Sequence, residues 1–350
     1  MTLVQERLPP GWSIRLSSDQ EAERRIDGVA ELTAPDGTTA VFLIEAKRSF
    51  VTSDLAAALD RIRSHRLPRV ARPMPLLAAR YLGSSVRSWL EERGVSYVDA
   101  TGNMHLRLEQ PAMYMRDRGA DRDPWRGPGR PRGTLQGPPA SRVVRALIDF
   151  VEPMTVPELI RLSGASTGAT YRVVEFLERE ALLRRGQGGR VVEVEWRRLL
   201  ERWSEDYGFQ SSNSVTRCLI PRGLPALEES LRDAQGLRYA LTGSLAAHRL
   251  APYAPVRLAM AYVDDVSQTI EKLSLRPVDS GANVLIAHGK YDVVFDRVEQ
   301  DDGLTFVAPS QAVVDLLTGP GRSAAEGQEV LDWMERHESS WRRQPAGSRA

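Results

Sequence analysis

The chain has 350 residues, of which 42% are hydrophobic and 27% charged, and its formal net charge is +1. This length and composition predict a globular protein of two or three domains. The small net charge excludes a molecule that attracts nucleic acid through an overall positive field, so any such affinity has to come from local basic patches. The single cysteine, Cys218, excludes an intrachain disulfide framework and a cysteine-rich zinc site.

Membrane and secretory segments are not expected. Apolar runs stay well short of the roughly 18 residues that a membrane helix needs, and the first ten residues have no signal-peptide core. We therefore predict a cytoplasmic protein with no membrane partner.

Residues 1–118 are predicted to form one α/β domain. Two strand-like runs flank the turn Pro35-Asp36-Gly37, and this pattern predicts a hairpin of residues 30–33 and 41–45. Helices are predicted over 53–65 and 74–93, and short strands over 95–99 and 104–108.

Three charged residues lie where the strands of this hairpin meet. Glu45 and Lys47 are two apart on one strand and project to the same face, and an antiparallel neighbour can bring Asp27 beside them. This pattern resembles the PD-(D/E)XK nuclease-like fold. The resemblance implies that all three are catalytic, with Asp27 and Glu45 binding Mg²⁺ and Lys47 helping to activate water. The alternative is an exposed pair of opposite charges without a function.

Residues 119–140 are rich in Gly, Pro and Arg and are predicted to form an extended linker. The run Gly129-Arg130-Pro131-Arg132-Gly133 is similar to the core of an AT-hook, in which arginines enter a narrow minor groove. The alternative is a plain tether, in which Arg130 and Arg132 add only non-specific affinity for phosphates.

Residues 141–207 carry the most consistent pattern in the chain. Apolar residues at 144, 147, 148 and 151 predict a first helix that leaves Arg142 and Arg145 outside its apolar face. Thr155 and Glu158 are spaced as a capping box at the start of a second helix, which Gly164 ends.

A third helix and a hairpin are predicted to follow. Ser166 or Thr167 can cap a helix whose residues 169, 173 and 177 face inward, while Thr170, Tyr171 and Arg172 face outward. The runs 182–185 and 190–194, separated by a glycine-rich tip, predict a two-stranded hairpin. These elements together predict a winged helix-turn-helix.

A winged helix-turn-helix binds DNA by placing its third helix in the major groove, where small polar side chains approach base edges. Arginines around that surface contact phosphates and fix the register without reading sequence. The alternative is a module for protein contacts, because Glu175, Glu178 and Glu180 dilute the positive charge. The predicted base contacts are Ser166, Thr167, Thr170 and Tyr171, and the predicted phosphate contacts are Arg142, Arg172, Arg184, Arg185 and Arg190.

An aromatic seam leads out of this segment. Trp196, Leu199, Leu200, Trp203 and Tyr207 recur at helical spacing, so a helix with one apolar face is predicted. A contact between domains, or between the copies of a homodimer, explains such a seam better than a cofactor site.

Residues 208–340 alternate between strand-like and helical runs, and 341–350 are predicted to be a disordered tail. The run Tyr239–Ala247, together with Ala308–Leu317 and Gly321-Arg322, resembles the C-terminal domain of AbiEi-type antitoxins from type IV toxin–antitoxin systems. The run Val95–Asn103 also resembles a segment of such regulators. Strands are predicted over 215–220, 239–242, 257–262, 284–288, 293–295 and 305–308.

Gly243-Ser244 resembles the start of a nucleotidyltransferase motif, which needs two acidic residues one apart on the next strand to hold Mg²⁺. That strand instead ends in adjacent residues, Asp264 and Asp265, whose side chains diverge in regular strand geometry. We therefore expect a nucleotidyltransferase-like scaffold without transferase activity.

The sequence predicts a multidomain α/β (α+β) protein with a nuclease-like domain, a central winged helix-turn-helix and a nucleotidyltransferase-like C-terminal domain. The predicted function is that of an antitoxin-like transcriptional regulator that binds specific double-stranded DNA, with a toxin as a further partner and no cofactor. One alternative is a DNA endonuclease that uses Mg²⁺ at the nuclease-like site. Another is an interaction protein that neutralises a toxin without DNA.

Overall fold

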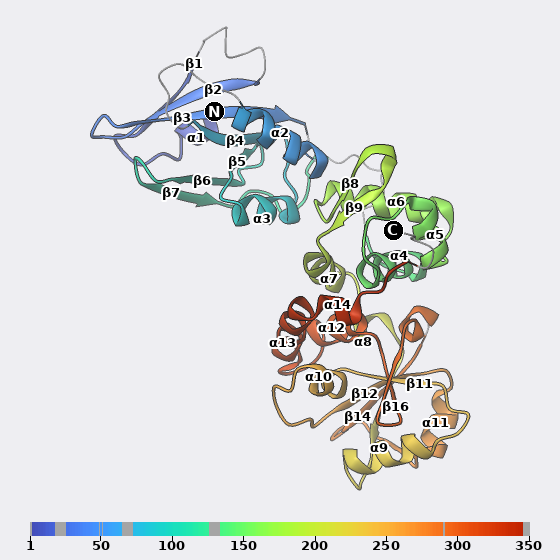
Figure 1. Ribbon diagram of the computed structural model, residues 1–350. Coiled ribbons are helices and arrows are strands. Elements are labelled where there is room, and N and C mark those ends of the chain that lie inside the picture. Colours follow the sequence, from blue (N-terminus) through green and yellow to red (C-terminus); the bar gives the residue numbers. More distant parts are fainter. Residues whose placement is uncertain are drawn as a thin grey trace. The chain divides into compact units, whose positions relative to one another are not determined.

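The computed structural model describes residues 2–17, 26–48, 50, 52–64, 73–125, 134–289 and 291–345. Within these ranges the protein has a mixed α/β fold with two seven-stranded sheets and one two-stranded sheet (Figure 1). The predicted α/β class is thus confirmed. None of the helices in these ranges is long and apolar enough to cross a membrane.

Backbone contacts divide the chain into two compact units. The first consists of residues 1–132 and 174–187, and the second of residues 133–173 and 188–350. The boundaries predicted at residues 140 and 207 both lie inside the second unit, and residues 174–187 of the segment predicted as one domain belong to the first unit.

In the sheet of the first unit, the strands are neighbours in the order in which they occur in the chain. The first three form an antiparallel meander, and the fourth and fifth run parallel to the third because helices connect them. The elements are α1 (Thr2–Gln5), β1 (Ser13–Ser17), β2 (Gly28–Thr33), β3 (Thr39–Lys47), α2 (Thr52–Ser64), β4 (Met74–Ala79), α3 (Ser84–Glu92), β5 (Ser96–Asp99), β6 (Met104–Leu108) and β7 (Met113–Asp117).

Both faces of this sheet are buried. Leu43 of β3 packs in a cluster with Leu59 of α2 and Leu90 of α3. Its neighbours Phe42 and Ile44 point to the opposite face and belong to a second cluster. This alternation follows from the two-residue period of a strand, and it explains why β3 is apolar over a continuous run.

The hairpin of β2 and β3 confirms the prediction made from the turn at residues 35–37. The helix predicted over 74–93 is wrong in its first part, because Met74–Ala79 forms β4 and the helix begins only at Ser84. β4 lies between β3 and β5 and buries Leu76 and Leu77. A buried central strand has no polar alternation, so its pattern cannot be told from that of a buried helix.

Three helices and a hairpin follow at residues 138–194. Thr155 and Glu158 form the predicted capping box, and Gly164 ends the second helix in the left-handed region with φ 61°. The predicted order of helices and hairpin is confirmed. The elements are α4 (Pro138–Asp149), α5 (Val156–Ser163), α6 (Thr167–Arg179), β8 (Leu183–Arg185), the short 3₁₀ helix η2 (Gln187–Gly189) and β9 (Val191–Val194).

Helix α7 (Trp196–Ser204) carries the aromatic seam, and the four apolar residues of the seam that lie within the helix are buried. This helix packs against α4 and against α12 (Pro309–Leu317), both in the second unit. The seam is therefore covered within the chain, and it gives no separate support for a homodimer.

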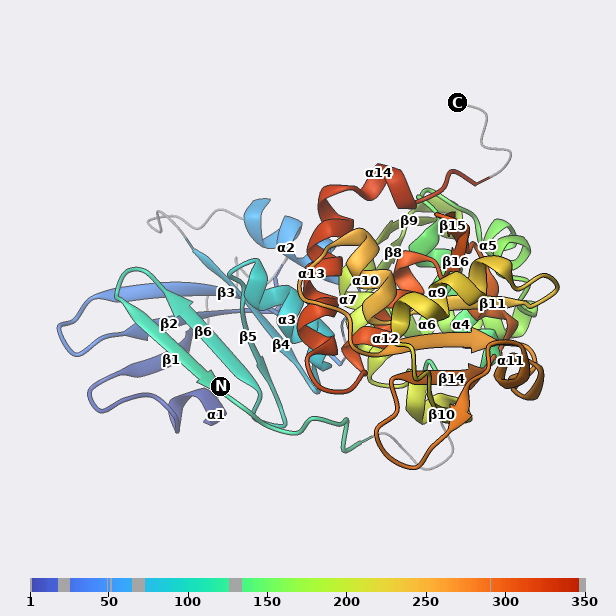
Figure 2. The ribbon, with the colours of Figure 1, turned by 90° about the horizontal axis from the view of Figure 1, so that it is seen from below.

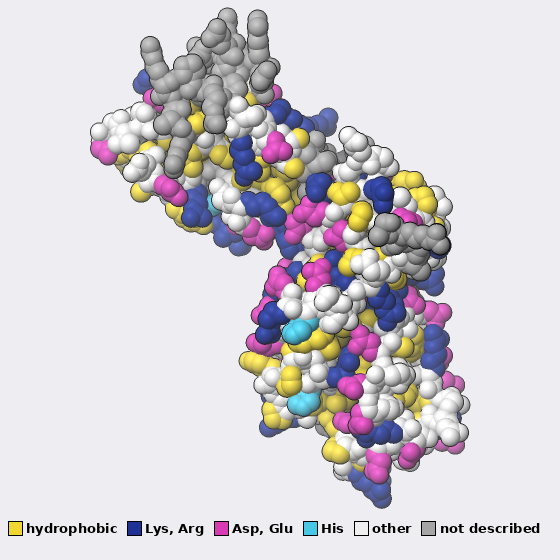
Figure 3. Space-filling model, viewed as in Figure 1, with side chains coloured by type: hydrophobic (Ala, Val, Ile, Leu, Met, Phe, Trp, Pro, Cys, Tyr) yellow, Lys and Arg dark blue, Asp and Glu magenta, His cyan; other side chains and the backbone are white. Residues whose placement is uncertain are grey.

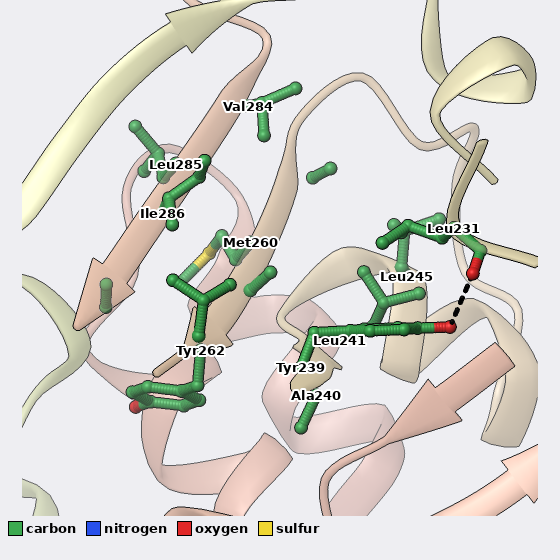
Figure 4. Close-up of a cluster of buried hydrophobic side chains, with 14 of the residues drawn as sticks. Leu231, Tyr239, Ala240, Leu241, Leu245, Met260, Tyr262, Val284, Leu285 and Ile286 are labelled. Atoms are coloured by element: carbon green, nitrogen blue, oxygen red, sulfur yellow. Dashed lines mark hydrogen bonds between the residues drawn. The ribbon is translucent and has the colours of Figure 1, made fainter. Parts of the chain in front are cut away.

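The sheet of the second unit has the strand order β13-β10-β14-β12-β11-β16-β15. Its core gathers side chains of β11, β12 and β14, among them Leu241, Tyr262 and Ile286 (Figure 4). The strands are β10 (Val215–Leu219), β11 (Tyr239–Thr242), β12 (Ala259–Val263), β13 (Arg276–Pro277), β14 (Val284–His288), β15 (Glu299–Asp301) and β16 (Leu304–Phe306).

Helices accompany this sheet on more than one side (Figures 1 and 2). Helix α10 contacts β11 and β12, while α9 contacts β16 and α11 contacts β14. Residues 293–295, predicted as a strand, instead belong to a 3₁₀ helix, η3 (Asp292–Phe295). The remaining helices are α8 (Phe209–Ser212), α9 (Leu224–Asp233), α10 (Ser244–Leu250), α11 (Val266–Lys272), α13 (Ser323–Arg336) and α14 (Glu338–Trp341).

The disordered tail predicted for residues 341–350 is wrong for its first residues. Trp341 and Arg342 are buried at 6% and 9% exposure, and Arg343 pairs with the backbone of Phe150. Residues 346–350 lie outside the described residues.

Candidate functional site

The first half of α6 presents a continuous exposed face, which we call the α6 face: Ser166, Thr167, Gly168, Tyr171 and Arg172. The Oγ atom of Ser166 accepts a hydrogen bond from the backbone N–H of Ala169 at 3.4 Å, so Ser166 caps the helix. Ala169 and Val173 are buried on the opposite side, as predicted. Tyr171 is 41% exposed.

Thr170 corrects the prediction. It is fully buried, and its hydroxyl donates a hydrogen bond to the backbone oxygen of Ser166 at 3.1 Å. The expectation that Thr170 faces outward is therefore wrong. Thr170 lies three and seven residues before the buried Val173 and Leu177, which places it on the inner side of the helix, and its hydroxyl is satisfied there by a carbonyl of the preceding turn.

Three of the arginines predicted as phosphate contacts lie in the second unit. Arg172 and Arg190 are exposed and Arg142 is half-buried. Hydrogen bonds from Thr155 hold the pKa of Glu158 below its usual value, and the charges of Arg190 and Arg161 add to this effect. Arg190 thus lies close to the start of α5. Arg161 was not predicted as a site residue, although its place in the last turn of α5 is a signal for an exposed cation.

On the face of the molecule shown in Figure 3, Lys and Arg side chains are interspersed with Asp and Glu side chains. This distribution agrees with the small net charge of the chain.

Two predicted phosphate contacts, Arg184 and Arg185, lie in the stretch that belongs to the first unit. Both are half-buried, and the Nε atom of Arg185 donates to Oε2 of Glu178 at 3.0 Å. Arg185 would have to leave Glu178 to contact a phosphate. Arg130 and Arg132, the arginines of the AT-hook-like run, lie outside the described residues.

Arg145 is the largest departure from prediction. It was expected outside the apolar face of the first helix, but it is fully buried. Its guanidinium donates to Asp149 (3.1 Å), to Gln311 (2.9 Å) and to the backbone oxygens of Val293 (3.2 Å) and Asp296 (3.0 Å). Every contact of this guanidinium beyond α4 is made to the C-terminal part of the second unit.

Asp149 completes this buried charge cluster. Its carboxylate also accepts hydrogen bonds from Arg297 and from the hydroxyl of Ser310. Burial raises the pKa of Asp149, but the charges of Arg145 and Arg297 outweigh burial and hold it below the usual value. Asp149 is therefore an anion in the folded protein. The i, i+4 spacing of Arg145 and Asp149 is the one sequence signal that could have predicted the pair.

A second buried acid lies next to this cluster. Asp315 of α12 accepts hydrogen bonds from Thr242 (2.6 Å), Tyr262 (2.8 Å) and Gln311 (3.0 Å). Gln311 thus connects Asp315 to Arg145. Burial raises the pKa of the Asp315 carboxyl to about 7.

The raised pKa of Asp315 predicts a pH-dependent stability. Its ordinary value is 3.8, so between pH 3.8 and about 7 the folded state binds a proton that the unfolded state has lost. The contribution of the Asp315 carboxyl to the free energy of unfolding is therefore fully present below pH 3.8 and is lost as the pH rises to about 7. The variant Asp315→Asn keeps the shape and removes the titration. We expect the stability of the variant relative to wild type to rise between pH 5 and 7, by about 1.4 kcal/mol per pH unit.

Urea unfolding at pH 5, 6, 7 and 8 measures this difference. Asp279→Asn, at an exposed position in the same unit, is the matched control and is expected to show no such trend. A pH-independent difference between Asp315→Asn and wild type would contradict the prediction.

In the first unit, the structure brings Asp27 next to the end of β3. The Oδ2 atom of Asp27 accepts a hydrogen bond from the backbone N–H of Ala46 at 2.8 Å, between Glu45 and Lys47. Glu45 is buried at 4% exposure, whereas Asp27 is exposed. The predicted neighbourhood of Asp27 and the Glu45 strand is therefore present.

The charge around Glu45 differs from what a metal site requires. Oε1 of Glu45 lies 2.6 Å from Nε of Arg61 on α2, so a cation of the protein already neutralises this carboxylate. Among the described residues, no three His, Cys, Asp or Glu side chains form a group that could hold a metal ion. These residues do not fit a resident Mg²⁺, because a divalent ion and the guanidinium of Arg61 would compete for one carboxylate.

Gly243 and Ser244 lie at the predicted turn between β11 and α10. β11 and β12 are antiparallel, and the N–H of Asp264 bonds to the backbone oxygen of Arg238 at the other end of β11. Asp264 is therefore five strand positions from Gly243, roughly 16 Å at 3.3 Å per residue. Met260 packs against Gly243, so the residue of β12 beside Gly243 is apolar.

Comparisons of this chain with protein-family models, with curated proteins and with solved structures find no match.

Proposed function

We propose that this protein is a sequence-specific DNA-binding transcriptional regulator that acts by occupying an operator. The observation that carries the proposal is the α6 face, an exposed stripe of hydroxyls, an aromatic ring and an arginine at the start of the third of three short helices. Such a stripe matches the part of a recognition helix that contacts base edges in the major groove. The helices with their hairpin have the order of a winged helix-turn-helix.

Basic residues of the same unit support the proposal. Arg172 and Arg190 are exposed, and Arg142 lies in the first turns of α4. We assign contacts with phosphates to these three, which would fix the register of the protein on the duplex. Thr170 is not included among the base contacts, because its hydroxyl is buried and bonded within the helix.

The functional unit is larger than the segment 141–207. Isolating that segment would expose Arg145 and remove all its partners outside α4. A DNA-binding experiment therefore needs the full chain. Incubating it with a pool of random duplexes and sequencing those that stay bound tests the proposal. We expect one motif to be enriched, whereas a pool that stays random would contradict sequence-specific binding.

The resemblance of the C-terminal third to AbiEi-type antitoxins extends the proposal to autoregulation with a toxin partner. Among the described residues no contact identifies that partner, so the support is the sequence resemblance alone. Genes that flank this one test it directly, because an adjacent nucleotidyltransferase toxin would favour the antitoxin role.

The alternative of a DNA endonuclease rests on Asp27 lying beside the Glu45 strand. The ion pair between Glu45 and Arg61 argues against it. We therefore expect no cleavage of single-stranded or duplex DNA when the full chain is incubated with Mg²⁺ or Mn²⁺. Cleavage that both Asp27→Ala and Lys47→Ala abolish would overturn this expectation and favour the endonuclease.

A further inference from the structure

The end of the chain returns to the first of the three helices. We call residues 338–343 the C-terminal strap. Within it, Arg342 is buried, and its Nε donates to the backbone oxygen of Ile148 at 3.0 Å. Its Nη2 donates to the backbone oxygen of Phe150 at 2.7 Å. These oxygens lie at the C-terminal end of α4, where carbonyl groups have no partner within the helix and where a cation is favoured.

The backbone of the C-terminal strap is also hydrogen-bonded to the end of α4. The N–H of Arg343 donates to the oxygen of Asp149 at 2.8 Å, and the N–H of Val151 donates to the oxygen of Arg343 at 3.0 Å. Trp341 packs edge-on against Trp196 at 5.1 Å between ring centroids. The strap is thus fixed on both sides of the point where the chain leaves α4.

Arg342 also reaches the hairpin through one intermediate residue. Its Nη2 lies 2.6 Å from Oε2 of Glu152. The other carboxylate oxygen of Glu152 accepts a hydrogen bond from the backbone N–H of Val194 in β9, at 3.1 Å. Glu152, which Arg342 holds, therefore links the strap to β9, in addition to the backbone pairing of Met154 with Val191.

We propose that Arg342 is a positioning residue for DNA recognition, which holds the exit of α4 and the β9 side of the hairpin in one geometry. This inference rests on the proposed function. A recognition helix contacts base edges only when the neighbouring helix and hairpin hold it at the right angle to the groove. Contacts with phosphates tolerate a looser geometry because they carry no sequence information.

The test uses the full chain, the variant Arg342→Gln and the control Arg343→Gln. The control removes the same charge from the next residue, whose side chain is exposed and which contributes its backbone to the attachment. We expect Arg342→Gln, and not the control, to speed hydrogen exchange at the amides of Val151 and Val194 about tenfold or more. We also expect about tenfold weaker binding to the enriched duplex, with binding to random duplex changed less than about threefold.

The conservative variant Arg342→Lys keeps the charge but cannot donate to two carbonyls and a carboxylate in a planar fork. We expect its preference for the enriched over the random duplex to lie between those of Arg342→Gln and the wild type. Glu152→Gln should also lower the preference for the enriched duplex. The double variant of Arg342→Gln and Glu152→Gln should lower it little further than Arg342→Gln alone, because both substitutions break the contact between Arg342 and Glu152.

The outcomes separate the inference from the proposed function. Unchanged exchange at Val151 and Val194 would overturn the inference whether or not the protein binds DNA. Equal losses for enriched and random duplexes would reduce Arg342 to a structural residue and overturn it as well. If the wild-type chain prefers no duplex, the proposed function fails, the positioning role falls with it, and the exchange rates still show whether Arg342 holds the hairpin.

Discussion

Replacing Arg145 with Met is expected to lower the free energy of unfolding of the second unit by about 3 to 5 kcal/mol, the usual cost of removing one partner from a buried ion pair. The fully buried Asp149 would keep Arg297 and Ser310 but lose the guanidinium at 3.1 Å. Gln311 and two backbone oxygens would lose their donor. Met keeps the aliphatic part of the side chain but ends before the guanidinium, so the loss includes both the lost bonds and the space that the guanidinium fills.

Arg142→Met is the matched control, because Arg142 lies one turn earlier on α4 and is only half-buried. We expect it to change stability by no more than about 0.5 kcal/mol, as surface substitutions usually do. Urea unfolding followed by tryptophan fluorescence measures both variants. Equal effects of the two substitutions would show that Arg145 is not held as the structure has it.

Replacing Tyr171 with Ala is expected to weaken binding to the enriched duplex by about 1 to 3 kcal/mol, the range for one lost base contact. Tyr171 is exposed at the centre of the α6 face. Its replacement would remove the proposed contact in the groove without removing a buried side chain from the protein core. Binding to random duplex should change little, because phosphate contacts by Arg172 and Arg190 remain.

Thr170→Val is the matched control for Tyr171→Ala. The adjacent hydroxyl is buried and bonded to Ser166, so its removal should leave the preference for the enriched duplex within a factor of about two. Titrations with labelled duplexes measure both variants. A large effect of Thr170→Val without any effect of Tyr171→Ala would contradict the orientation of α6.

Local signals in the sequence predicted much of the fold. The capping box at Thr155 and Glu158, the stop at Gly164 and the turn at residues 35–37 all depend on contacts within a few residues, and each is present. β4 was missed for the opposite reason. Its apolar run is that of a strand paired on both sides, and those pairings join residues far apart in the chain.

The same distinction holds for the site residues. The exposure of Tyr171 and Arg172 follows from helical spacing, which the sequence shows directly. The burial of Arg145 does not, since its partners Gln311 and Val293 come roughly 150 residues later. Long side chains with charged ends are usually placed on the surface by pattern alone. Only tertiary contacts reveal that this arginine is held inside the second unit.

The most direct test of the regulator proposal is to titrate the full chain with the enriched duplex and with a scrambled duplex at several salt concentrations. We predict that the logarithm of affinity falls linearly with the logarithm of salt for both duplexes, because phosphate contacts release counterions. At physiological salt, the enriched duplex should remain at least about 1,000-fold preferred, as expected for specific recognition. Equal affinity for the two duplexes at every salt concentration would contradict the proposed function.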